Sequence, residues 1–320
     1  MGQEHPRASA RLAIRAQLTA LVASLAAVSC GGAPSSAAAS PAAHFPVTLT
    51  QSDGTKVTIA QRPRRVISLS STATEMLFAI NAGAQVVAVD DQSNYPPNAP
   101  ITKLSGFQPN IEAIAGYTPD LVVASDDLGG LVHGMQALAV PILLEPAARN
   151  LDESYAQIKQ LGAATGHPAE ADSLVARMQA QVRSFLALVS RPARHLRVYH
   201  ELDNTYYSAT SATFIGQVYR LLGLDNIADA VTTGAKDYPQ LSAEYIVNAN
   251  PDLIVLADTR CCGQNLTAVA SRPGWRVIKA VKSGQVVGVD DDVASRWGPR
   301  IVDFMEAVAP HVQQLEKQAA

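Results

Sequence analysis

EAIAGYTPDLVVASD at residues 112–126 and EYIVNANPDLIVLAD at residues 244–258 are two versions of one sequence pattern. Each has a short helical segment that ends near a proline, followed by a run of apolar residues typical of a strand buried on both faces. The two prolines lie 132 positions apart, as do Val66 and Val198 of an upstream apolar run. Three landmarks in register indicate a duplicated α/β unit. Two similar lobes that face each other form a cleft, where small molecules commonly bind.

Strands and helices alternate around both copies, which argues for mainly parallel sheets. We therefore expect an α/β protein with lobe one at 64–150 and lobe two at 191–320. Alternating β-branched residues around Asp53-Gly54 also predict a β-hairpin within 46–63. The predicted buried strands lie at 64–70, 85–89, 121–124, 140–144, around 197, at 253–256 and at 285–289.

A helical region over 151–190 separates the two lobes. From Pro168 to Ser190 the sequence has no glycine and no further proline, and apolar residues recur at helical spacing. A helix of this length spans about 33 Å at about 1.5 Å per residue. The pattern predicts one long, stiff helix that links the lobes, rather than a flexible crossover.

The composition is ordinary for a soluble globular protein, with 48% hydrophobic residues, 17% charged residues and a formal net charge of −3. A nucleic-acid partner would need a strong basic excess, so none is expected. The length of 320 residues is enough for two domains, each with its own core. Three cysteines are too few for a disulfide scaffold.

Residues 1–30 are typical of an export signal, with arginines before an apolar core at 18–28 that is too short to be a membrane span. The core ends in AVSC, which resembles a bacterial lipoprotein box in which Cys30 is lipidated. A plain secretory signal with an incidental cysteine is the alternative. Residues 31–45 are rich in Ala, Ser and Pro and predict a flexible tether. We expect an exported protein, either lipid-anchored on the extracytoplasmic side of the cell membrane or periplasmic.

Six motifs spread over about residues 46–310 make the chain resemble the ABC-importer receptors that capture ferric chelates, haem and vitamin B12, and above all the vitamin B12-binding branch. The motifs are RVISLSSTATE from Arg65, NYPP from Asn94, PNIE from Pro109, YPQLSAE from Tyr238, RPGW from Arg272 and SRWGPR from Ser295. The resemblance implies a class III periplasmic-binding fold, in which two Rossmann-like lobes are joined by one long rigid helix. It also implies a monomeric, non-enzymatic receptor that delivers a corrinoid or a ferric siderophore to an ABC permease and ATPase complex.

The resemblance further implies which side chains hold the ligand in the cleft. An apolar ligand face favours aromatic planes, with a few polar groups to fix its orientation. Packing in the core or at the rim is the alternative role for each position. Two positions depart from the branch: Gln92 occurs where an aromatic residue is often found, and Tyr238 where tryptophan is common. The ligand therefore stays open between a corrinoid and a ferric chelate. The matching cleft positions are Tyr95, Phe107, Tyr238, Asp292 and Arg296.

In the vitamin B12 receptors one surface glutamate on each lobe docks into arginine pockets of the permease, and Glu112 and Glu244 match these two positions. Two carboxylates on matched lobes form a two-point clamp for guanidinium groups. The alternative is that each is simply an acidic residue favoured at the start of a helix.

Cys261-Cys262 has no counterpart in the general pattern of the family. In an exported protein, adjacent cysteines either form a strained vicinal disulfide that stiffens the cleft wall or remain two reduced thiols in a loop. A structural zinc site would need two more ligands, and no histidine nearby in the sequence supplies them.

Three other functions are alternatives to that of a receptor for a corrinoid or ferric siderophore. Haem capture would need a side-chain iron ligand, for which His133 and Met135 in a predicted lobe-one loop and Tyr206 and Tyr207 in a lobe-two loop are candidates. The seven histidines are not clustered, which disfavours capture of bare Zn or Mn. Rossmann-like lobes also host enzymes, but the sequence has no G-x-G-x-x-G after a strand, no glycine-rich loop with lysine and no G-x-S-x-G. We expect no resident cofactor and no catalytic activity.

Overall fold

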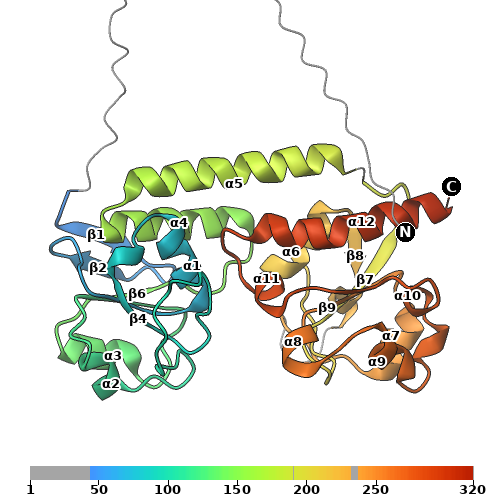
Figure 1. Ribbon diagram of the computed structural model, residues 1–320, viewed down its shortest axis with the longest axis horizontal. Helices are drawn as coiled ribbons and strands as arrows, with labels where there is room; N and C mark the ends of the chain where they lie inside the picture. Colours follow the sequence, from blue (N-terminus) through green and yellow to red (C-terminus); the bar gives the residue numbers. More distant parts are fainter. Residues whose placement is uncertain (1–43, 190, 232–236, 320) are drawn as a thin grey trace, which may run out of the picture. The chain divides into compact units, whose positions relative to one another are not determined.

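Two four-stranded parallel sheets correspond to the two halves of the sequence repeat (Figure 1). The computed structural model describes residues 44–189, 191–231 and 237–319. The strand order is β4-β3-β5-β6 in lobe one and β8-β7-β9-β10 in lobe two, so each sheet has its strands in the order second, first, third, fourth. This shared topology confirms the predicted duplication. The strands are β3 (Val66–Leu69), β4 (Val86–Val89), β5 (Leu121–Ala124), β6 (Ile142–Leu144), β7 (Leu196–Glu201), β8 (Leu224–Asn226), β9 (Leu253–Leu256) and β10 (Val286–Gly288).

The aspartate of each repeat copy ties two neighbouring strands together. Asp120 accepts a hydrogen bond from the backbone N–H of Arg65 at 2.8 Å, and its own N–H donates to the Arg65 carbonyl at 3.0 Å. Asp252 makes the same pair of bonds to Arg197, at 2.9 Å and 2.8 Å. Each aspartate therefore fixes the register of the third strand of its sheet against the first, which explains why Pro-Asp occurs at equivalent places in both lobes.

Three helices cover the same side of both sheets: α4 (Leu151–Thr165), α5 (Pro168–Leu188) and α12 (Ile301–Ala319) (Figure 1). Under them lies one apolar core shared by the two lobes, which includes Val66 of β3 and Val198 of β7. The length of the chain allowed a separate core for each lobe, but the structure has a common one on this side. The reason is that α5 runs along both lobes and packs on α4 over lobe one and on α12 over lobe two.

On the opposite side each lobe has a core of its own, because alternate strand residues point to opposite faces. In β5, Leu121 and Val123 belong to the shared core, whereas Val122 and Ala124 belong to the lobe-one core. The lobe-one core is covered by α2 (Ile111–Ala115) and α3 (Leu131–Ala137), and the lobe-two core by α7 (Ala243–Ala249), α9 (Leu266–Ser271) and α10 (Lys279–Lys282). The remaining α-helices are α1 (Ser71–Ala79), α6 (Phe214–Leu221), α8 (Thr259–Cys262) and α11 (Asp291–Ser295).

The predicted long helix is α5, which begins at Pro168 as expected and ends at Leu188, two residues earlier than the pattern suggested. Proline is well suited to the first turn because its missing N–H would have no helical partner there. The 21 residues span about 30 Å at about 1.5 Å each. Figure 1 shows α5 running along both lobes as one continuous helix.

The predicted hairpin is also present, as β1 (Val47–Thr50) paired antiparallel with β2 (Lys56–Ile59). Gly54 adopts φ +84°, which glycine takes without steric cost, and Asp53 accepts a hydrogen bond from the Thr55 N–H at 2.8 Å. The predicted export signal with Cys30, and the tether up to residue 43, lie outside the described residues. Within the described parts of the chain, no helix is long and apolar enough to cross a membrane.

Candidate functional site

A cavity of about 510 Å³ lies where the carboxyl ends of the strands in both lobes meet. Open parallel sheets bind ligands at this edge, near the point where the strand order reverses. Its volume is within the usual range of about 300–1,000 Å³ for small-molecule sites. The cavity is lined by Leu69, Ser70, Ser71, Thr72, Asp90, Gln92, Gly106, Phe107, Ser125, Asp126, Leu128, Ala147, Ala257, Cys261, Asp291, Asp292, Ser295, Arg296 and Trp297.

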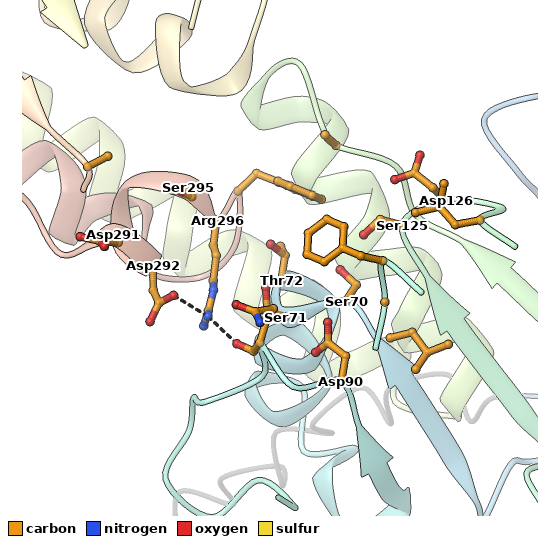
Figure 2. Close-up of a pocket in the computed structure, with 18 of the residues that line it drawn as sticks. Ser70, Ser71, Thr72, Asp90, Ser125, Asp126, Asp291, Asp292, Ser295 and Arg296 are labelled. Atoms are coloured by element: carbon orange, nitrogen blue, oxygen red, sulfur yellow. Dashed lines mark hydrogen bonds and ion pairs between the residues drawn. The ribbon is translucent and has the colours of Figure 1, made fainter. Parts of the chain in front are cut away.

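Five hydroxyl-bearing side chains and four aspartates lie among apolar residues in the walls of this cavity (Figure 2). On the lobe-one side they come from the segments that follow β3, β4 and β5, and on the lobe-two side from α11 and the turn after it. Ser70 caps α1, since its hydroxyl accepts a hydrogen bond from the Ala73 N–H, and so the first turn of α1 faces the cavity. Such a surface can offer many hydrogen bonds to a polar ligand.

Phe107 adds an aromatic side chain to the lobe-one wall and is 73% exposed. The residue before it, Gly106, packs tightly on the end of β3, where a Cβ atom would lie 2.5 Å from the Leu69 carbonyl oxygen. Glycine is therefore required for this close approach, which holds the Phe107 segment at the cavity.

A buried ion network joins the two lobes behind the cavity. Glu75 of α1 accepts hydrogen bonds from Arg296 at 2.7 Å and from two nitrogen atoms of Arg300 at 2.6 and 2.9 Å. The Glu75 side chain is 1% exposed, that of Arg296 5% and that of Arg300 18%. Arg296 also donates to Asp292 at 2.7 Å and to the Gln92 carbonyl at 2.8 Å. Breaking a buried ion pair by removing one partner is costly, so this network holds the lobes together at the cleft.

Two further side-chain contacts cross from lobe to lobe near this network. Asn94 donates to Asp292 at 2.7 Å, and the Trp297 indole donates to Gln157 of α4 at 2.7 Å. These bonds involve α11 and the segment between α11 and α12, which therefore connect the lobes through several polar contacts.

Two aspartates of the cavity have shifted pKa values. Burial raises the pKa of Asp90 above its usual value, although the Ser93 hydroxyl donates to it at 2.5 Å. Burial acts to raise the pKa of Asp291 too, but N–H groups of Cys261 and Arg260 donate to its carboxylate and lower the pKa overall. Asp291 is therefore held in its charged form.

Three of the five predicted ligand residues, Phe107, Asp292 and Arg296, line the cavity. Tyr95 and Tyr238 do not line it. Tyr95 instead packs its ring against the Arg300 guanidinium, 4.3 Å from the ring centroid, and is 41% exposed. Tyr238 is 38% exposed and lies beside an undescribed segment, 232–236.

The two predicted docking residues occupy equivalent exposed places. Glu112 lies in the first turn of α2 and Glu244 in the first turn of α7. The helix caps are equivalent as well, because the side chains of Asn110 and Ser242 accept from the N–H three residues on. Figure 1 shows α2 and α7 on the side of their lobes away from α5.

Cys261 and Cys262 carry free, exposed thiols in the structure, so the vicinal disulfide considered from the sequence is not formed there. They lie in the helical turn α8, not in a loop. Successive helical residues project about 100° apart around the axis, which does not favour a bond between adjacent sulfur atoms. Cys261 lines the cavity.

None of the four candidate iron ligands lines the cavity. His133 and Met135 belong to α3 rather than to a loop, and Met135 is fully buried in the lobe-one core. Tyr206 stacks on Trp275, with ring centroids 5.6 Å apart, and Tyr207 lies beside it in the chain. In the described parts of the chain, no three His, Cys, Asp or Glu side chains gather closely enough to hold a metal ion.

Three buried ionisable groups lie deeper in the lobes. Burial raises the pKa of Glu145 to about 8, and it lowers that of His200 to about 3. Burial and the neighbouring Glu201 raise the pKa of Asp258 to about 7. Glu201 itself accepts two hydrogen bonds from Arg272, both at 2.6 Å.

Sequence reasoning missed the hydroxyl-rich lobe-one wall and the role of Glu75. A usable signal was present, because polar residues such as Ser70 and Ser125 directly follow buried strands. Glu75 gave no such signal: it occupies a helix, and its partners follow more than 200 positions later.

The chain is similar to several binding proteins. It is 29% identical over 277 residues to an uncharacterized ABC transporter substrate-binding lipoprotein of Bacillus subtilis, covering 84% of this chain and 86% of that protein. It is 32% identical over 276 residues to a cobalamin-binding protein of Halobacterium salinarum, covering 84% and 74%.

A solved structure, the periplasmic vitamin B12 binding protein of Vibrio cholerae, matches with a TM-score of 0.66 and 25% identity, covering 80% of this chain and 98% of that one. The likeness confirms the predicted class III periplasmic-binding fold, with two lobes joined by one long helix. The family model described as "Periplasmic binding protein" matches residues 66–293, which include both sheets and most of the residues that line the cavity between them. This chain therefore belongs to the periplasmic binding protein family.

Proposed function

We propose that this protein is the extracytoplasmic receptor of an ABC importer and that it captures a corrinoid in the cavity between its lobes. Like its relatives it is a substrate-binding transport protein, not an enzyme. The observation that carries the proposal is the cavity itself, which joins the carboxyl ends of both sheets and combines Phe107 with a hydroxyl-rich wall. A corrinoid presents a broad apolar face and a rim of carboxamides, which such a surface complements.

The relatives favour a corrinoid over the other chelates, since the Halobacterium protein is named for cobalamin binding and matches 84% of this chain. A ferric siderophore is the competing ligand. Titration calorimetry of the purified protein against cyanocobalamin, haem and a ferric trihydroxamate distinguishes them. We expect cyanocobalamin to bind with a dissociation constant of about 1 μM or tighter, equivalent to about −8 kcal/mol. Tight binding of a ferric chelate without corrinoid binding would assign the protein to iron uptake.

Glu112 and Glu244 are proposed as the two contacts with the permease. Their exposed positions in matched helices of the two lobes support this role. The continuous helix α5 and the shared core keep their separation constant, as a two-point dock onto paired arginines requires. Each lost charge-assisted contact costs about 1.5–3 kcal/mol, and charge reversal adds repulsion.

Permease association and ligand affinity are measured together for Glu112→Arg and Glu244→Arg. Both variants should lose association and keep ligand affinity. Glu306→Arg is the matched control, because Glu306 is an exposed glutamate on α12, outside α2 and α7. Normal association of both docking variants would show that the two glutamates reflect the duplicated fold alone.

The proposed receptor is a monomer that is lipidated at Cys30 after removal of residues 1–29. Support comes from the AVSC motif and from the Bacillus relative, which is named a lipoprotein. Mass spectrometry of the mature N-terminus should find a diacylated Cys30, and Cys30→Ala should release the protein from the membrane fraction. A Cys30→Ala protein that remains membrane-bound contradicts lipid anchoring.

A further inference from the structure

The described residues that line the cavity carry an excess of negative charge. They include four aspartates, Asp90, Asp126, Asp291 and Asp292, and one cation, Arg296. Among these described side chains, Asp90, Asp126 and Asp291 are in no salt bridge. Asp291 is held charged by backbone N–H groups, and Asp126 is exposed at the end of β5.

Arg296 is not available to a ligand. Its two terminal nitrogen atoms donate to Glu75 and Asn94, and to Asp292 and the Gln92 carbonyl, and its side chain is 5% exposed. Glu75, which does not line the cavity, therefore neutralises Arg296, the one cationic side chain among the described residues that line it. A ligand carboxylate would have to displace buried, charge-assisted bonds to reach this guanidinium.

Two more guanidinium groups lie near these aspartates, the exposed Arg260 and the largely buried Arg300, and both are paired with acids. Arg260 interacts with Asp290 and Asp292 at 3.2 Å, and Arg300 with Glu75. The first turn of α1 does favour anions, but a helix N-terminus contributes only about half a positive charge. That is less than the charge of the unpaired aspartates, so the potential in the cavity stays negative.

We infer that this cleft selects against anionic ligands, because its lining aspartates outnumber its one arginine and because Glu75, which does not line the cavity, helps to occupy that arginine, Arg296. The preferred ligand is uncharged or cationic and brings N–H donors to the aspartates. The inference rests on the proposed function in that it concerns the same cavity. The inference restricts the expected ligand to a corrinoid with intact carboxamides or to an uncharged or cationic chelate.

The test uses a matched pair of probes: cyanocobalamin, and cyanocobalamin with one side-chain carboxamide hydrolysed to a carboxylate. The two differ by one negative charge on the same macrocycle. We expect the acid to bind about three- to tenfold more weakly, from unit charges about 6 Å apart in a water-like dielectric. The difference in affinity between the two corrinoids should be largest at about 10 mM salt. It should become smaller at about 150 mM salt, where the screening length falls to about 8 Å.

Asp126→Asn provides the variant arm, because it removes one exposed charge from the wall without disturbing the buried network. It should strengthen binding of the acid about two- to threefold and change binding of the amide less. Asp127→Asn is the control: Asp127 is exposed beside it, does not line the cavity and accepts from the Val132 N–H, which an asparagine oxygen also does. The control substitution should leave the difference in affinity between the two corrinoids unchanged.

Each outcome decides a separate point. Equal affinity for the two corrinoids, with both binding, overturns the charge selectivity and leaves the proposed function intact. If neither corrinoid binds, the proposed corrinoid-binding function fails. Binding of two ferric chelates of different charge then tests whether the cleft selects against anionic ligands. Binding of an uncharged or cationic ferric trihydroxamate alone supports it, whereas binding of a triply anionic ferric tris-catecholate overturns it.

Discussion

Replacing Glu75 by glutamine tests the ion network that joins the lobes. The substitution keeps the shape of the side chain and one oxygen acceptor, but it removes the charge that faces Arg296 at 2.7 Å and Arg300 at 2.6 and 2.9 Å. Because Glu75 and Arg296 are almost completely buried, water cannot replace the lost partner. Breaking a buried ion pair in this way costs about 3–5 kcal/mol.

The free energy of unfolding of Glu75→Gln is measured by urea denaturation and the melting temperature by circular dichroism. A loss of this size lowers the melting temperature by about 10 °C, since about 1 kcal/mol corresponds to about 2–4 °C in a protein of roughly this size. Asp172→Asn is the control, because Asp172 forms a 2.9 Å ion pair with Lys159 in which both side chains are more than half exposed. Surface pairs contribute about 0–1 kcal/mol. If Glu75→Gln loses no more stability than Asp172→Asn, the network does not hold the lobes together.

Three further experiments follow from the structure. Phe107→Ala should weaken corrinoid binding by about 1–3 kcal/mol in calorimetry and leave the melting temperature unchanged, because Phe107 lines the cavity but is 73% exposed; unchanged affinity would remove Phe107 from the site. In Glu145→Gln, the unfolding free energy should depend less on pH between about 4.5 and 8, because in the native protein Glu145 keeps its proton in this range while the unfolded chain releases it. The unfolding free energy of the native protein therefore falls as pH rises, by at most about 1.4 kcal/mol per pH unit for this group. It is measured by urea denaturation at several pH values, and the same pH dependence in both proteins would contradict this. Small-angle scattering should show little change in the radius of gyration when ligand binds, since α5 and the shared core resist closure of the lobes; a large compaction would disprove this.

Much of the fold could be predicted because its signals are local in the sequence. The β-branched runs at 121–124 and 253–256, the unbroken helical period after Pro168 and the Asp53-Gly54 turn each depend on neighbouring residues alone. Duplication reinforced these signals, since the central strand of each repeat and the helix before it could be compared between the two lobes. The position of Pro-Asp in each copy reflects bonds to Arg65 and Arg197 that recur in both sheets.

The cavity and its charge were decided by the tertiary structure. The sequence placed Asp292 and Arg296 near the ligand through the family resemblance, but Glu75 lies 221 positions from Arg296 and faces it only because α1 and the α11–α12 turn meet behind the cleft. The core shared under α4, α5 and α12 is likewise a property of packing, because apolar periodicity says that a face is buried but not which neighbour buries it. Contacts between distant segments depend on how whole elements are arranged, and no local pattern in this chain encodes that arrangement.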